Sequence, residues 1–394
     1  MASIVTSDDD GRTPVLLVTD IGADLDDTLA FLTIAGSPAL RLVGVVTSVG
    51  DGVARGCVMR GWLRRLGYAD GEVPVLPSVD TATAGVVAPP GTPAPADAAL
   101  GAVADTPRAI VAIARAYGAR LAIVGIAALT PIAAALREPG GRDALRGVGR
   151  LYLQGQCVVA EPAGAGAAGG CGCCLDGAAG ALAPDSAAYN FRTDMAAAAE
   201  VLDALQDAVP MRFLGKFAAY AVGVTKDELG TLDRAVGAAP SCAPARALPS
   251  MREMAKAQMD GFRQGNPALF FKIYAVPEQH RSLQTHAWYD HLPEGVISHP
   301  YDPLLALALV EEVEADAKRA KPSSLTSTIR RPPPPPLFDR RAVGEPTHDG
   351  ARHTTIGNAP DACGVVDVEL TKRALVAAMN RGVDRFGRFG SSVC

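Results

Sequence analysis

The sequence has few aromatic residues and no long apolar run. Aromatic residues are 5% of the 394 residues, although hydrophobic residues of all kinds are 48%. A core of Ala, Val and Leu is typical of helices packed on a parallel sheet, and a β-sandwich is less expected. No segment supplies the roughly 18 apolar residues that a membrane span needs, so we expect no membrane partner.

The sequence also lacks clusters of positive charge, both along the chain and in its first residues. The chain has no run of five Lys or Arg residues, and its formal net charge is −5, so nucleic acid is an unexpected partner. The first residues, Met1–Pro14, are acidic where a signal peptide is basic, and they lack its apolar core. These features predict a soluble, cytoplasmic protein.

The cysteines are not arranged as metal ligands. Eight are present, at positions 57, 157, 171, 173, 174, 242, 363 and 394. The group Cys171, Cys173 and Cys174 lacks the CxxC pair with a distant partner pair that zinc sites use. We therefore expect free thiols.

Short aliphatic runs alternate with helical patterns, which predicts a parallel sheet. Strands are expected at Val15–Val18, Leu42–Val46, Leu121–Ile126, Leu151–Leu153 and Met211–Leu214, and helices at Thr28–Ala35, Arg55–Gly67, Pro107–Tyr117, Pro131–Leu136 and Arg373–Phe386. The fold class is thus α/β, a mostly parallel sheet flanked by helices, and we expect a single domain over 13–394.

Three segments interrupt this alternation. The Gly/Ala/Cys tract 163–183 has no periodicity and predicts a flexible insertion. The segment 227–291 is long and aromatic, and predicts a helical insertion, either a lid or a packed subdomain. The segment 321–341 holds the prolines Pro332–Pro336 and predicts a Pro-rich loop of polyproline II type.

The densest chemical signal is an acidic run after the first strand. Four carboxylates, Asp20, Asp24, Asp26 and Asp27, lie within eight residues, where a strand ends and a helix begins. Ligands bind at this edge in open α/β sheets. Two of these carboxylates could merely favour a helix N-terminus. Four are costly without a cation, and ligands that are all oxygen favour a hard ion such as Ca²⁺.

Two enzyme families place such a run here. Asp24 to Thr28 fits the DxDxT motif of haloacid-dehalogenase-type phosphatases, in which the first Asp is a nucleophile. That motif needs its first Asp directly at the strand end, whereas here the strand ends at Asp20 and three residues intervene. The phosphatase is therefore the less favoured alternative.

The other family accounts for more of the chain. The segments Thr19–Ala30, Ser37–Thr47, Val49–Asp51, Gly125–Ala133, Ala188–Asp194 and His299–Leu304 resemble, in order, the DTDxGxDDAxA, SPE-L-L-G-I-T, AGN, GPLTNIA, AEFNxxxD and HDPL segments of nucleoside hydrolases. The chain thus resembles a divergent member of the inosine-uridine preferring nucleoside hydrolases, over most of residues 14–310.

The resemblance implies a role for each matching residue. Metal ligands for Ca²⁺ would be Asp20, Asp27, Asp302 and the main-chain carbonyl of Ile126; substrate contacts would come from Asp24, Asp26, Asp51 and Asn190. It implies an N-glycosidase of purine or pyrimidine salvage, which cleaves a ribonucleoside or related N-riboside to ribose and base with a Ca²⁺-bound water, and a homodimer or homotetramer. Asp20 could accept the water's proton, while carboxylates stabilise the positive charge that builds on the ribosyl ring.

Departures from the family concern the leaving group and the sugar. Ala188 replaces the family's Glu, and Tyr301 replaces the His of HDPL, so Tyr301 and His299 become the candidate acids. A protein that binds ribose or a nucleoside without turnover, or with altered specificity, is therefore the second alternative.

Overall fold

The computed structural model describes residues 10–22, 25–78, 92–159, 181–225, 227–228, 263, 267, 296–320, 341–342, 353–356 and 368–389. Almost all of the three interrupting segments, 163–183, 227–291 and 321–341, therefore lie outside the described residues. The statements below concern only the residues within these ranges.

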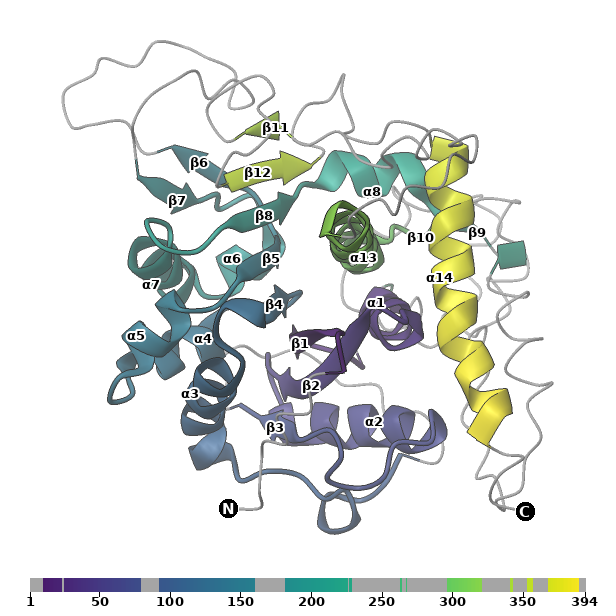
Figure 1. The fold of residues 1–394 in the computed structure, drawn as a ribbon, viewed down its shortest axis with the longest axis horizontal. Helices are drawn as coiled ribbons and strands as arrows, with labels where there is room; N and C mark the ends of the chain where they lie inside the picture. The colour runs from purple at the N-terminus through teal and green to yellow at the C-terminus, as the bar shows by residue number, and fades with distance from the viewer. Residues whose placement is uncertain are drawn as a thin grey trace.

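A sheet with the strand order β11-β12-β8-β5-β4-β1-β2-β3 forms the centre of the fold (Figure 1). Its strands are β1 (Thr13–Thr19), β2 (Leu40–Thr47), β3 (Val75–Pro77), β4 (Ala122–Gly125), β5 (Arg150–Gln154), β8 (Met211–Leu214), β11 (Arg341–Ala342) and β12 (His353–Ile356). All neighbours pair in parallel except β11, which is antiparallel to β12. Two antiparallel pairs lie apart from it, β6 (Cys157–Val159) with β7 (Leu182–Pro184) and β9 (Val224–Thr225) with β10 (Val296–Ser298).

Helices cover both faces of the sheet. On one face lie α1 (Leu25–Gly36), α2 (Gly52–Arg65), α8 (Lys216–Val222), α13 (Tyr301–Ala320) and α14 (Val368–Phe389). On the other lie α3 (Thr106–Tyr117), α4 (Thr130–Arg137), α5 (Gly141–Arg146) and α7 (Met195–Leu205). The short helix α6 (Tyr189–Thr193) precedes α7.

The strand residues explain why both faces need a cover. Along β1, Val15 and Leu17 belong to one apolar core, and Leu16 and Val18 belong to the other. Successive side chains of a strand point to opposite faces, so an unbroken apolar run buries both. The α/β class and the mostly parallel sheet expected from the sequence are confirmed.

Helix α1 is almost wholly buried. Its residues from Leu25 to Ala35 are all buried, and it packs against β2, α13 and α14. Burying one Leu, Ile or Phe side chain stabilises a fold by roughly 1.5–3 kcal/mol, so this helix is firmly held. Its N-terminus, with Asp26 and Asp27, is thus a rigid support.

Backbone close approach fixes α1 against α14. A Cβ added to Gly36 would lie 2.2 Å from the main-chain nitrogen of Gly382, and one added to Gly382 would lie 2.3 Å from the carbonyl oxygen of Leu32. Only glycine allows such contact.

Of the helices in the described ranges, none is both long and apolar enough to cross a bilayer.

Candidate metal and ribose site

The strand order places a switch in chain direction between β1 and β4. From β1 the chain continues through β2 to β3 on one side, whereas β4, β5 and β8 extend on the other. Ligands in open α/β folds bind outside the carboxyl ends of the strands at such a point. Asp20 directly follows β1, and Ile126 directly follows β4, so both flank it.

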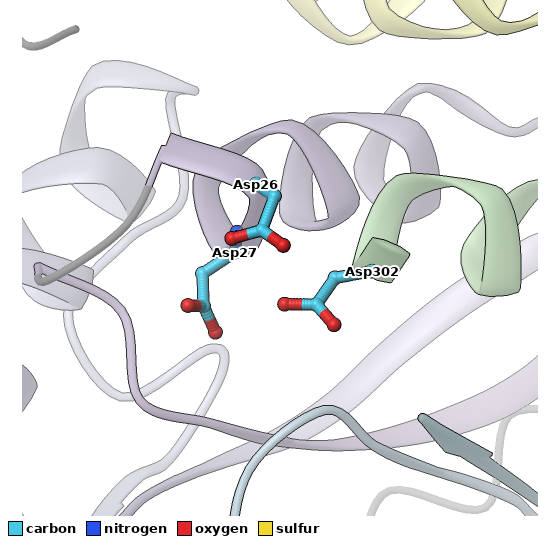
Figure 2. A group of neighbouring side chains, drawn as sticks. All are labelled: Asp26, Asp27 and Asp302. Atoms are coloured by element: carbon cyan, nitrogen blue, oxygen red, sulfur yellow. The ribbon is translucent and has the colours of Figure 1, made fainter. Parts of the chain in front are cut away.

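Three buried carboxylates meet at this edge. One ligand atom from each of Asp26, Asp27 and Asp302 can be chosen so that all three lie within 4.8 Å of one another. Figure 2 shows the side chains pointing toward a common centre, the first two from the start of α1 and the third from the start of α13. Their exposed fractions are 6%, 2% and 5%.

Hydrogen bonds orient the carboxylate of Asp27 toward the end of β1. Its Oδ1 accepts from the hydroxyl of Thr19 and, at 3.2 Å, from the main-chain N–H of Asp20. Asp26 in turn accepts from the N–H of Asp27 at 3.1 Å. The start of α1 and the end of β1 are therefore joined through a carboxylate, and Thr19 is a supporting residue that the sequence did not reveal.

The donor set suits a hard cation. Like charges this close and this buried repel strongly unless a cation lies between them, and a helix N-terminus offsets only part of that repulsion. Oxygen donors with no His or Cys favour Ca²⁺ or Mg²⁺. The buried acidic triad of Asp26, Asp27 and Asp302 could thus hold an ion, and the residues present fit one.

Two expected ligands occupy the same edge without belonging to this triad. Asp20 is partly buried, and its main-chain N–H binds Asp27. Ile126 donates its N–H to the carbonyl of Val18 at 2.9 Å, which fixes it beside the end of β1. Their role as metal ligands stays a prediction.

The residues expected to contact substrate differ in their burial and in their hydrogen-bond partners. Asn190 is buried at the start of α6 and donates from Nδ2 to Oε1 of Gln154 at 2.7 Å. Gln154 ends β5, so this pair belongs to the same edge of the sheet, and Gln154 was not singled out from the sequence. Asp51 is exposed and caps α2, accepting from the N–H of Ala54 at 2.9 Å. Asp24 lies outside the described residues.

The two candidate acids lie beside Asp302. Tyr301 is the first residue of α13, and its ring lies 6.5 Å from the ring of His299 in an edge arrangement. Burial lowers the pKa of His299 below its usual value, although a backbone hydrogen bond at Ala219 partly opposes this. His299 is therefore mostly neutral at neutral pH and poorly suited to donate a proton.

The phosphatase alternative requires its nucleophile at the strand end. Strand β1 ends at Thr19, five positions before Asp24, so Asp20 holds the strand-end position that the DxDxT motif gives to its first Asp. This spacing disfavours the phosphatase, as the sequence had indicated.

Known proteins resemble this chain in structure. No family model and no curated protein matches the sequence. The effector protein XOO4466 matches with 24% identity and a TM-score of 0.64, over 94% of each chain. The type III effector XopQ, solved with adenosine diphosphate ribose, matches with 22% identity and a TM-score of 0.65, over 94% of this chain and 93% of its own. The purine-preferring ribonucleoside hydrolase of Gardnerella vaginalis matches with 17% identity and a TM-score of 0.54, over 94% and 99%.

These similarities define the class of fold. The parallel sheet flanked by helices is the nucleoside hydrolase-like fold, shared by enzymes and by effector proteins. Since all identities are below 25%, the likeness extends to the fold, and activity has to be argued from the site.

Proposed function

We propose that the protein binds the ribose of an N-riboside through Ca²⁺ held by Asp27 and Asp302, with Asp26 beside the ion, and hydrolyses its N-glycosidic bond. The single observation that carries the proposal is the convergence of these buried carboxylates from two distant parts of the chain. Asp20 and the carbonyl of Ile126, at the same edge, would complete the ligand set. The nearby buried pair of Asn190 and Gln154 would contact the sugar.

Each side chain has a task in this reaction. A bound Ca²⁺ would supply Lewis acidity, orienting the ribose diol and making a water molecule more acidic. Asp20, partly exposed beside the triad, would accept that water's proton. Asp26 would hold a ribose hydroxyl, and the negative charge of the triad would stabilise the developing oxocarbenium ion. Tyr301 would protonate the leaving base, because burial lowers the pKa of His299 and so disfavours the imidazolium form that an acid catalyst needs.

The test is a panel of purine and pyrimidine ribonucleosides, with adenosine diphosphate ribose added, incubated with the protein and Ca²⁺. Release of free base, together with new reducing sugar from the nucleosides, is expected for at least one compound. Asp27→Asn and Asp302→Asn should lower the rate by on the order of 100-fold or more, because both the orientation and the charge of the site are lost. Absence of sugar release across the panel, with Asp20→Ala identical to the parent, would refute hydrolysis.

Two observations favour a second function, binding of a ribosyl compound without turnover. XopQ was solved with adenosine diphosphate ribose, and here Ala188 stands where the nucleoside hydrolase motif has Glu. Calorimetric titration separates the two functions. A pure binding protein would retain adenosine diphosphate ribose in a Ca²⁺-dependent way and release no sugar from any compound that binds.

A further inference from the structure

Arg55, on α2, is fully buried and binds neutral main-chain groups. Its exposed fraction is 0%, and its donors contact the carbonyl oxygens of Asp20, of Ile21 at 2.9 Å and of Val49 at 2.6 Å. These carbonyls belong to two loops, the one after β1 and the one after β2, both at the carboxyl edge of the sheet. A buried guanidinium is costly, so its use to join two loops needs a reason.

The first loop carries the acidic run. Arg55 grips Asp20 and Ile21 from the side of α2, and the N–H of Asp20 binds the carboxylate of Asp27. Asp20 is thus held at its carbonyl by Arg55 and at its N–H by Asp27. A substitution of Arg55 would therefore affect the triad through Asp20.

The second loop is strained where Arg55 holds it. Val49 has a φ of 68°, and a β-branched residue rarely adopts this left-handed conformation. Its carbonyl accepts from Nε of Arg55, and the next residue but one, Asp51, caps α2. Backbone strain of order 1–3 kcal/mol persists only where the surroundings enforce it, and it clusters at functional sites.

From these contacts we infer that Arg55 is a positioning residue of the metal site: it ties the loop after β1 to the loop after β2 and so fixes Asp20 and Asp27 for the ion. The inference rests on the proposed metal site. Arg55 has hydrogen-bond donors and no acceptor, so it is not itself a ligand of the ion. Its effect is on the affinity and the water content of the ion's coordination shell.

The same helix supplies a matched control. Arg60 is also 0% exposed, and it also donates to main-chain carbonyls, of Ala98 at 2.9 Å and of Val73 and Ala99 at 3.2 Å. Each arginine keeps one buried terminal nitrogen without a hydrogen-bond partner among the described residues. These carbonyls lie outside the two loops at the site, so Arg60 reports the general cost of losing a buried arginine.

The experiment compares Arg55→Met and Arg55→Lys with Arg60→Met and Arg60→Lys. Ca²⁺ affinity is measured by calorimetry, bound water by Tb³⁺ luminescence lifetimes in H₂O and D₂O, and stability by thermal unfolding in EDTA. The Arg60 variants should lose stability and keep their Kd within about twofold. The Arg55 variants should raise Kd at least about tenfold, as loss of a supporting partner does at metal sites, and admit more water to the ion.

Other outcomes overturn the inference. An unchanged Kd in the Arg55 variants would make this residue a support of the fold alone. Tighter binding in Arg55→Met, with parental affinity in Arg55→Lys, would mean that the guanidinium acts only as a nearby positive charge. If the parent protein binds no Ca²⁺, the proposed function is refuted. That result differs from the one that refutes only the role of Arg55, in which the parent binds Ca²⁺ and the Arg55 variants bind it equally well.

A measurement on the parent covers the case in which the Arg55 variants do not fold. Hydrogen exchange with and without Ca²⁺ should show added protection at Ile21 and also across Arg55, at Val49. Amides near Arg60, such as that of Val73, should not change. Protection confined to Asp20, Ile21 and the start of α1 would contradict the coupling.

Discussion

Asp302 is the residue that distinguishes a metal site from a helix N-terminus. Asp26 and Asp27 alone could be explained by the dipole of α1. The carboxylate of Asp302 is brought to them on another helix and buried to 5% exposure, where like charge costs stability unless a ligand requires it. Sites that bind ligands commonly carry this kind of cost.

This cost predicts a crossover for Asp302→Asn. In EDTA the variant should be more stable than the parent by about 1 kcal/mol, because one of the mutually repelling charges is gone. In excess Ca²⁺ the order should reverse, since the parent gains the binding free energy of the ion. Thermal unfolding in both conditions measures the crossover, and a variant less stable than the parent in EDTA would show that the triad is not strained.

His299 makes a separate contribution that depends on pH. Burial lowers the pKa of this histidine in the folded chain below the value of 6.5 expected when unfolded. The unfolded chain therefore binds more protons just below that pH, so the stability from the neutral ring is complete above about 6.5 and is lost as the pH falls. Denaturant unfolding of His299→Gln should show a shallower loss of stability between neutral and mildly acidic pH than the parent. Parallel curves for the two proteins would contradict this.

Several elements could be predicted from the sequence because local patterns determine them. The unbroken apolar runs of β1, β2 and β4 indicate strands buried on both faces, and the structure confirms them within a few residues. Helix α2 begins at Gly52, earlier than expected at Arg55, because Asp51 caps it. Helix α13 was not predicted as a helix, since residues Leu304–Val310 are all buried and leave no polar face to reveal the period.

At the site, sequence motifs predicted which residues take part, but they did not predict which other side chains contact them. The motif resemblance singled out Asp26, Asp27 and Asp302, which the structure brings together. The sequence placed Arg55 at the start of an expected helix, Arg55–Gly67, and gave it no role at the site. Its burial depends on the loops that fold around it, and no local pattern carries that information.

The crossing of α1 and α14 predicts sensitivity at Gly36. A Cβ there would meet main-chain atoms of Gly382 and Ala378, which cannot move aside like a flexible side chain. Gly36→Ala should destabilise the protein by about 1–3 kcal/mol, the usual cost of overpacking. Gly61→Ala, on α2, is the control, since its nearest neighbour would be 3.5 Å away and a helical Ala should stabilise by roughly 0.5–1 kcal/mol. Chemical denaturation measures both; equal effects would contradict the close approach.

At the scale of the molecule, a cluster of charges joins α13 to the sheet. Glu312 accepts from Arg150 at 2.9 Å, from the hydroxyl of Tyr152 at 2.8 Å and from Arg212 at 3.0 Å. The apolar residues of α13 would tolerate sliding along the sheet, whereas these directional bonds permit one register. The cluster at Glu312 thus fixes the position of α13 along the sheet. Because Asp302 lies at the start of the same helix, its position over the ends of the strands is fixed as well.

Loss of this cluster should therefore be costly. Glu312→Gln is expected to destabilise the protein by about 3 kcal/mol, because two arginines lose a largely buried partner. The control Glu200→Gln breaks the exposed contact with Arg137 and should cost about 1 kcal/mol or less. Equal losses in urea denaturation would show that the cluster at Glu312 adds nothing specific.

The central claim is that carboxylates from α1 and α13 share one hard cation that holds a ribose diol. The most direct measurement is a crystal structure of the protein grown with Ca²⁺ and ribose. The account predicts one ion, with carboxylate oxygens of Asp27 and Asp302 and two ribose hydroxyls at roughly 2.3–2.6 Å. Ribose bound away from the triad, or a triad with no ion at saturating Ca²⁺, would contradict it.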